Sequence, residues 1–181
     1  MNDQATTSTR SSLLYDHAAI DAALDRLAGR IDAHYDGVSE VLMLPVMVGG
    51  MIPASLLALR MRTPLTFDYV HATRYRGKTT GDARIDWLHW PARDLQGQHV
   101  LLVDDIIDEG ATLRAIQARL CEAGVKSLRT AALVDKQHDR RVEGVGIDFV
   151  ELKVPDEYVF GFGMDLEERF RNLVEIRALH D

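Results

Sequence analysis

Three aspartates lie close together in residues 100–113, which read VLLVDDIIDEGATL. Asp104, Asp105 and Asp108 follow an apolar run and precede Gly110. The run is typical of a buried strand, and the residues after Gly110 predict a helix. Backbone N–H groups that converge at a helix N-terminus form an anion site. Aspartates repel phosphate, but they can accept hydrogen bonds from sugar hydroxyls or orient waters on Mg²⁺. A phosphorylated sugar with a metal ion satisfies all of these groups.

Other interpretations of this segment fit the residues less well. One aspartate often caps the following helix, but three within five residues are more than a cap needs. A Mg²⁺-binding phosphoacceptor domain would carry its acidic pair on the first strand, whereas this pair lies at mid-chain. A Walker loop is excluded, because neither Gly49-Gly50 nor Gly110 belongs to a GxxxxGK[ST] pattern.

The composition limits the classes of protein to consider. The chain has 181 residues, 46% hydrophobic and 27% charged, which predicts one globular domain. Its net charge of −7 disfavours nonspecific binding to nucleic acid. Cys121 is the only cysteine, and the polar N-terminal segment lacks the apolar core of a secretory signal. We therefore expect a cytoplasmic protein without disulfides, not bound to a membrane.

Strands and helices alternate along the rest of the chain. Residues 1–12 predict a flexible tail, and residues 13–181 a single domain that starts with a helix over 16–34, capped by Asp16. Strands are expected at 41–44, 65–71, 99–104 and 128–135, and helices at 51–59 and 111–123. Uniformly apolar strands indicate a parallel sheet covered on both faces, hence an α/β, Rossmann-like core flanked by helices. Ligands of such sheets bind beyond the strand C-termini, where Asp104, Asp105 and Lys136 would lie.

Two further segments need an interpretation. Residues 41–59 are uncharged over a length that could span a bilayer, but Pro45, Gly49-Gly50 and Pro53 divide them into a buried strand, a turn and a helix start. Residues 73–83 form a polar segment with Arg74, which predicts either a solvated hairpin loop or a lid over an anionic ligand. Residues 84–90 are the expected return strand of that hairpin.

The stretch VLLVDDIIDEGATL resembles the ribose-phosphate-binding motif of type I phosphoribosyltransferases, and its surroundings are similar to hypoxanthine-guanine phosphoribosyltransferases. The similarity runs over residues 41–171, with four motifs in the family's order. It implies purine salvage: transfer of the 5-phosphoribosyl group from phosphoribosyl pyrophosphate to hypoxanthine or guanine, giving IMP or GMP and pyrophosphate, with Mg²⁺. It also implies a small base-binding hood formed by about residues 150–181 and N-terminal elements, and a homodimer or homotetramer.

The resemblance implies a role for each matching residue. Asp108 matches the acidic residue near purine N7, where a carboxylate can do general acid/base work. Lys136 matches the donor to the C6 oxygen; because an ammonium only donates, it favours 6-oxopurines over adenine. The other matches are ribose and phosphate binding by Asp104, Asp105, Glu109, Gly110, Ala111 and Thr112; base binding by Tyr158 and Val159; pyrophosphate binding by Val48, Gly49, Gly50 and Arg171; a lid at Arg74 and Tyr75; and metal binding by Asp104, Asp105 and Asp165. From the residues alone, Tyr158, Phe160 and Phe162 predict an alternating strand face.

Two residues depart from the family pattern. Val48 stands where members often carry a basic residue, so only backbone groups of its loop can contact pyrophosphate. Glu109 stands where many have Thr, and we expect its carboxylate to turn outward so that only its N–H contacts the phosphate. Alternatives stay open: an enzyme that prefers xanthine, or a regulator on the same scaffold that binds nucleotide or RNA.

Overall fold

The structure is a computed structural model that describes residues 10–74 and 85–180. Tyr75 and the rest of the segment to residue 84 lie outside the described residues. In chain order the elements are β1 Ser11–Tyr15, α2 His17–His34, β2 Val41–Met47, α3 Met51–Ala58, β3 Leu65–Phe67, β4 Val70–Arg74, β5 Ile85–His89, β6 His99–Ile107, α4 Ala111–Glu122, β7 Ser127–Lys136, β8 Leu152–Val154, β9 Tyr158–Phe160 and β10 Ile176–Leu179.

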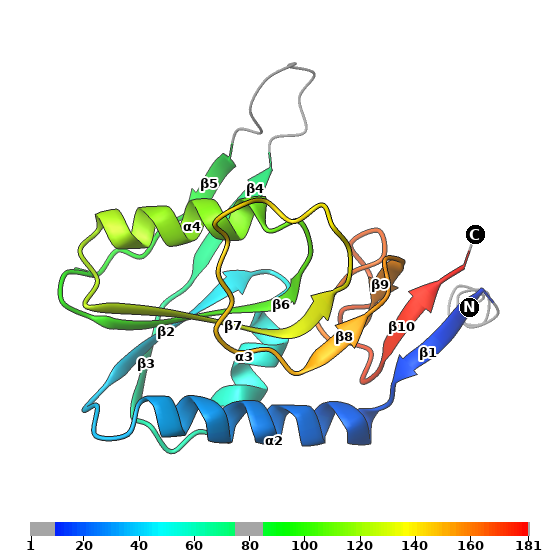
Figure 1. The fold of residues 1–181 in the computed structure, drawn as a ribbon, viewed down its shortest axis with the longest axis horizontal. Coiled ribbons are helices and arrows are strands. Elements are labelled where there is room, and N and C mark those ends of the chain that lie inside the picture. Colours follow the sequence, from blue (N-terminus) through cyan, green and yellow to red (C-terminus); the bar gives the residue numbers. More distant parts are fainter. Residues whose placement is uncertain (1–9, 75–84, 181) are drawn as a thin grey trace.

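The larger sheet has the order β5-β4-β2-β6-β7-β8 in the described part of the chain, and β3 also pairs with β2. Its pairings are parallel except for the antiparallel pair β4 and β5. Helices α2 and α3 cover one face of this sheet and α4 covers the other (Figure 1). The predicted α/β fold, a mostly parallel sheet with helices on both faces, is confirmed.

Strand β6 shows why the sheet forms at this sequence. Leu101 and Val103 pack into the core under α2 and α3, whereas Val100 and Leu102 pack into the core under α4. A strand that is buried on both faces needs apolar residues without alternation, and these four supply them. The strand continues beyond its predicted end, to Ile107, because its last residues keep pairing with β7.

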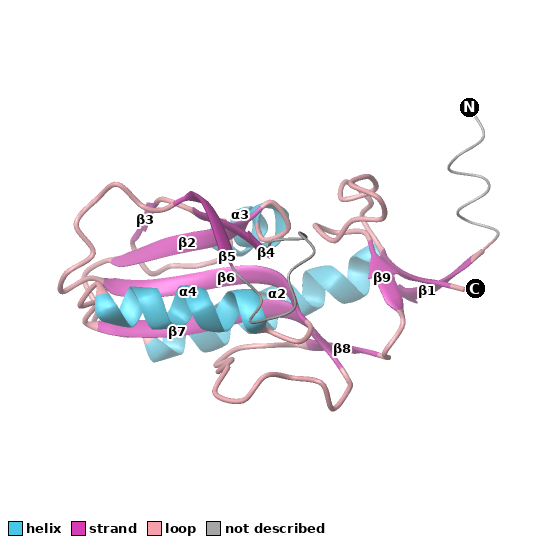
Figure 2. Cartoon of the chain, turned by 90° about the horizontal axis from the view of Figure 1, so that it is seen from above, coloured by secondary structure: helices cyan, strands magenta, loops and turns pink. Residues whose placement is uncertain are grey.

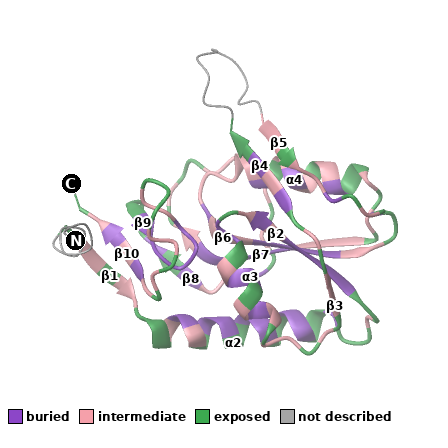
Figure 3. Cartoon of the chain, turned by 180° about the vertical axis from the view of Figure 1, so that it is seen from behind, coloured by how far each residue is buried: buried purple, intermediate pink, exposed green. Residues whose placement is uncertain are grey.

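Helix α2 begins where the sequence predicts. The Asp16 side chain accepts a hydrogen bond from the backbone N–H of Ala19 at 2.8 Å, as an N-cap should. The helix buries a stripe that includes Ile20, Leu24 and Ile31 and exposes its opposite side (Figure 3). Burial of this apolar stripe against the sheet stabilises the helix more than its intrinsic propensity does.

Residues 41–59 form β2, a turn and α3, as predicted. Within the described residues, no helix has both the length and the apolar character needed to cross a bilayer. The prediction of a single strand over residues 65–71 was wrong, because β3 and β4 are separate. Between them, the Asp68 side chain accepts the N–H of Tyr69 at 2.8 Å, so that backbone group is satisfied outside the ladder.

A smaller antiparallel sheet joins the two ends of the chain. In the described residues its order is β1-β10-β9. It lies at one end of the molecule, on the side toward which the arrow of β7 points (Figures 1 and 2). Ser11 and Ser12, which polarity had assigned to the tail, belong to β1. Strand β9 stops at Phe160 rather than continuing to Phe162, because Gly161 turns the chain with φ of 94°.

Candidate active site

A cavity of about 390 Å³ lies where the carboxyl ends of the parallel strands meet the smaller sheet. It collects predicted site residues from widely separated parts of the chain. They are Val48, Gly49, Asp104, Asp105, Asp108, Thr112, Lys136, Tyr158, Val159, Asp165 and Arg171. Gly50, predicted with the same loop as Gly49, is absent from this lining, and its N–H donates to the Val46 carbonyl at 2.9 Å.

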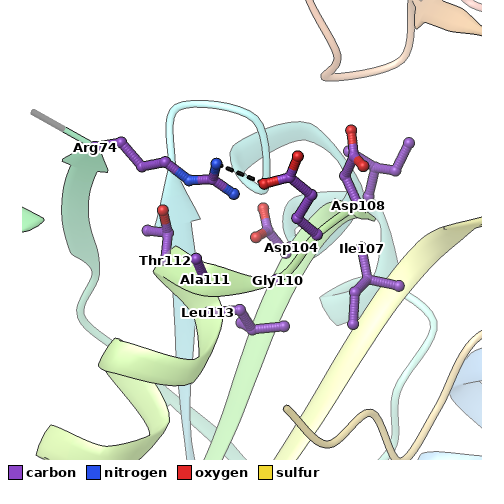
Figure 4. Close-up of a pocket in the computed structure, with 10 residues that line it drawn as sticks. Arg74, Asp104, Ile107, Asp108, Gly110, Ala111, Thr112 and Leu113 are labelled. Carbon is purple, nitrogen blue, oxygen red and sulfur yellow. Dashed lines mark hydrogen bonds and ion pairs between the residues drawn. The ribbon is translucent and has the colours of Figure 1, made fainter. Parts of the chain in front are cut away.

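A second cavity of about 310 Å³ adjoins the first around the start of α4 (Figure 4). Asp104, Asp108 and Thr112 line both cavities, so the two form one continuous site. The smaller cavity adds the remaining predicted phosphate and lid residues that the structure describes. These are Arg74, Glu109, Gly110 and Ala111.

The start of α4 leaves backbone N–H groups available to an anion. Gly110 is the N-cap, and no side chain caps the helix. Its φ of 81° is left-handed, and a Cβ there would lie 3.0 Å from Val145, so this turn requires glycine. The uncapped N–H groups and the positive end of the helix dipole suit a phosphate.

The Glu109 side chain has a charged partner that the sequence did not reveal. Its carboxylate pairs with the Arg74 guanidinium at 2.7 Å, the contact dashed in Figure 4. Both side chains remain about two-fifths exposed. Arg74 lines the same cavity and carries the opposite charge, so it partly offsets the charge of this carboxylate.

Asp108 is held from the end of β7 by two side chains. Lys136 Nζ lies 3.1 Å from Oδ2, and His138 Nε2 lies 2.7 Å from Oδ1. Burial raises the pKa of Asp108, but the hydrogen bonds from Lys136 and His138 and the charges of both groups outweigh burial and lower it. Asp108 is therefore ionised at neutral pH, as a proton acceptor must be.

Sequence reasoning missed His138 and Arg141. Arg141 donates to the backbone carbonyls of Asp108 and Lys136, at 3.4 and 3.1 Å, and pairs with Asp135. It thus joins the ends of β6 and β7. A sequence signal for His138 did exist: it stands two residues after Lys136, and in an extended chain residues i and i+2 point the same way.

Asp104 and Asp105 lie side by side against the Gly49 loop. A Cβ on Gly49 would come within 2.0 Å of Asp105 Oδ2, and a Cβ on Gly163 would come within 2.5 Å of the Gly49 carbonyl. Three segments therefore meet here with no room for side chains. Burial raises the pKa of both aspartates, and for Asp104 the neighbouring Asp105 raises it further.

Arg171 is fixed at the far wall of the cavity. Its guanidinium donates to the Gly163 carbonyl and to Asp165 Oδ1, each at 2.6 Å. Asp165 also accepts the N–H of Glu168 at 2.8 Å. Among the described residues, Asp104, Asp105 and Asp165 do not converge as a cluster of three metal ligands.

Comparisons with known proteins agree with this geometry. The sequence model of the phosphoribosyl transferase domain matches residues 11–169. A hypoxanthine-guanine phosphoribosyltransferase of Streptococcus pneumoniae is 32% identical over 169 residues, covering 93% of each chain. A hypoxanthine phosphoribosyltransferase of Salmonella typhimurium is 34% identical over 159 residues, covering 86% of this chain and 88% of its own.

Solved structures show the same likeness. A hypoxanthine phosphoribosyltransferase of Staphylococcus aureus superposes with a TM-score of 0.89 at 26% identity, covering 99% of this chain and 96% of its own. A point mutant of the hypoxanthine phosphoribosyltransferase of Trypanosoma cruzi, complexed with the product IMP, superposes with a TM-score of 0.85 at 25% identity. The match covers 93% of this chain and 89% of its own. Because the family model matches residues 11–169 and relatives above 30% identity match most of the chain, this chain belongs to the phosphoribosyl transferase family.

Proposed function

We propose that this protein transfers the 5-phosphoribosyl group from phosphoribosyl pyrophosphate to a 6-oxopurine, hypoxanthine or guanine, in purine salvage. The observation that carries the proposal is the continuous site around Asp104, Asp108 and Thr112. It offers N–H groups to a 5′-phosphate at α4, acceptors to a ribose, and both Lys136 and Asp108 to a purine edge. The relatives are named hypoxanthine-guanine phosphoribosyltransferase and hypoxanthine phosphoribosyltransferase, and these names support the same assignment.

The proposed reaction exchanges one bond at C1′ of the sugar for another. Purine N9 attacks C1′, the bond from C1′ to the pyrophosphate oxygen breaks, and pyrophosphate leaves with the bonding pair. The base enters as the tautomer protonated on N7, and that proton passes to Asp108. Lys136 donates a hydrogen bond to the C6 oxygen. Adenine carries an amino group at C6, so two hydrogen-bond donors would face each other, and adenine would bind less well.

Mg²⁺ belongs to the proposal as the cofactor, because Asp104 and Asp105 place two neighbouring carboxyl groups at the cavity, and Mg²⁺ binds to carboxylate oxygens. Mg²⁺ commonly uses one or two carboxylates plus substrate oxygens and waters, so a cluster of three protein ligands is not required. When bound, it would offset the charge of the departing pyrophosphate. Asp104 and Asp105, with Asp165 across the cavity, are the residues proposed to hold it.

We also propose that residues 150–181 and β1 form the base-binding hood. Tyr158 lines the cavity with an exposed ring of the kind that stacks on a purine, and Val159 lies beside it. Backbone groups of Val48, Gly49 and Gly50 would hold pyrophosphate without help from the Val48 side chain, and Arg171 would add a charge. Arg74, with Tyr75, which lies outside the described residues, is proposed as the lid.

A cytoplasmic homodimer or homotetramer completes the proposal. Large apolar side chains are exposed at Phe67, Tyr69 and Leu88, near the β3 and β5 edges of the sheet. Such residues commonly pack against a second copy. Light scattering on the purified protein would measure the mass in solution, and a monomer at micromolar concentration would contradict this part.

The decisive experiment is initial-rate nucleotide synthesis with Mg²⁺ and phosphoribosyl pyrophosphate, with hypoxanthine, guanine, xanthine and adenine offered separately. We expect turnover on hypoxanthine or guanine, little on adenine, and a loss of about a hundredfold or more in kcat for Asp108→Asn. Preference for xanthine would change the substrate and keep the reaction. No turnover with any base by the folded protein would contradict the enzyme and favour a regulator, for which nucleotide and RNA binding would then be measured.

A further inference from the structure

His138 is a buried side chain in contact with the proposed acid/base carboxylate. Only 2% of its side chain is exposed, and Nε2 lies 2.7 Å from Asp108 Oδ1. Its other ring nitrogen, Nδ1, accepts the backbone N–H of Arg140 at 3.0 Å. Because Nδ1 accepts, the ring proton must be on Nε2, which therefore donates to Asp108.

The loop that carries His138 is anchored on both sides. The Arg140 side chain makes two hydrogen bonds to Asp156, at 2.6 and 2.7 Å. The N–H of Val142 donates to the Glu109 carbonyl at 2.9 Å. These contacts fix the backbone around Arg140 and hence the direction of the His138 ring.

The two oxygens of Asp108 are used differently. Lys136 donates to Oδ2, but in the proposed function it must also reach the C6 oxygen of a bound purine. His138 donates to Oδ1 and has no such second task. When Lys136 turns to the base, His138 is the side chain that keeps hold of the carboxylate, and Oδ2 becomes free to accept the proton from N7.

We propose that His138 is a positioning residue: its Nε2–H locks Asp108 Oδ1 so that Oδ2 faces the purine as an ionised acceptor. The inference rests on the proposed function, since it names how the acid/base residue of that reaction is held. His138 itself neither touches the base nor takes its proton.

The inference predicts a pH dependence with a definite sign. An N–H donor favours the ionised carboxylate, so it lowers the pKa of Asp108, and its removal raises that pKa. Activity requires ionised Asp108 and is lost as pH falls through this pKa. The acid limb of kcat/KM for the base should therefore move to higher pH when the donor is removed.

Other groups around Asp108 stay the same in every variant of His138. On its own strand end and loop these are Asp104, Asp105 and Glu109. On β4 it is Arg74, and on the β7 end and the following loop they are Lys136, Arg140 and Arg141. Across the cavity they are Tyr158, Asp165 and Arg171. A shift of the limb between variants thus reports the contact of residue 138 with Asp108.

The test compares pH profiles of kcat and kcat/KM for the base in four proteins. His138→Leu removes the donor at similar size, and we expect kcat to fall about tenfold, part of what general acid–base catalysis supplies, with the acid limb shifted upward. His138→Gln places an amide N–H where Nε2 was and should restore both. His17→Gln changes a histidine that also faces an aspartate, Asp21 at 3.4 Å on exposed α2, and should match the unmodified protein.

Each outcome decides something different. If the unmodified protein makes no nucleotide, the proposed function fails and this inference with it. If it does, and His138→Leu keeps the limb in place, the inference alone is overturned. Should His138→Leu not fold, His138→Met replaces it: the thioether offers neither an N–H nor a charge to Asp108, so the upward shift is still expected, and an unmoved limb counts against the inference.

Discussion

The acidic strand end, residues 104–112, and the proposed hood, residues 150–181, line one cavity but are built in different ways. The strand end is contiguous and continues a strand that pairs with β2 and β7 on its two sides. In the hood, β9 is three residues long, and its partner β10 is held by β1 from the other end of the chain. The phosphate side is thus local in sequence, whereas the base side depends on long-range closure.

Gly49→Ala should have the largest effect, and it tests how rigid the strand end is. A Cβ would lie 2.0 Å from Asp105 Oδ2, so the Gly49 loop or the carboxylate must move. We expect kcat/KM for phosphoribosyl pyrophosphate to fall about a hundredfold, the effect of a displacement near 1 Å at a reacting centre. Gly146→Ala, with no atom within 4 Å of the new Cβ, is the control and should retain activity. A fully active Gly49→Ala variant would show that the Gly49 loop and the Asp105 side chain can move apart without loss of function.

Gly161→Ala tests the hood in the same way. The residue has φ of 94°, and a Cβ would lie 2.1 Å from the Glu175 carbonyl. We expect the free energy of unfolding in urea to fall by about 2 kcal/mol or more, and KM for the base to rise more than KM for phosphoribosyl pyrophosphate. Gly97→Ala is the control: Gly97 also has a positive φ, but no atom lies within 4 Å of an added Cβ. Comparing the two variants therefore separates the cost of backbone strain from the cost of the clash. Equal rises in both KM values would contradict the division between the two regions.

Arg171→Met probes the one hood charge proposed to contact pyrophosphate. The change removes hydrogen bonds to Gly163 and Asp165 as well as the charge. We expect kcat/KM for phosphoribosyl pyrophosphate to fall about tenfold, the size of a charge-assisted hydrogen bond. Arg26→Met, which breaks an ion pair between α2 and Glu151, should leave the rate unchanged. A loss confined to KM for the base would place Arg171 in the other half of the site.

The weakest response is expected at the ion pair between Arg74 and Glu109. Exposed pairs contribute at most about 1 kcal/mol, so Arg74→Ala should raise KM for phosphoribosyl pyrophosphate about threefold by leaving Glu109 unpaired beside a phosphate. Adding Glu109→Thr should reverse this rise. A double-mutant cycle over the four proteins measures the coupling. Strictly additive effects would mean that Arg74 does not offset Glu109.

The elements around the cavity were only partly predictable. The apolar run before Asp104 and the cap at Asp16 are short-range signals, and the strand and helix that they predict are present. The predicted strand over 65–71 failed because its break at Asp68 depends on a side chain replacing a ladder bond. The predicted continuation of β9 to Phe162 was wrong because the chain turns at Gly161, where it packs closely on the backbone of Glu175, 14 positions later.

Local sequence patterns were enough to predict the parallel sheet, its helices and the loop from Asp104 to Thr112, because apolar period, caps and turn residues act over a few positions. Tertiary packing was needed to establish that β1 joins the smaller sheet, that Arg74 pairs with Glu109, and that His138 contacts Asp108. Those contacts join residues 30 or more positions apart. Such contacts depend on how several elements pack at once, and no local pattern encodes that arrangement.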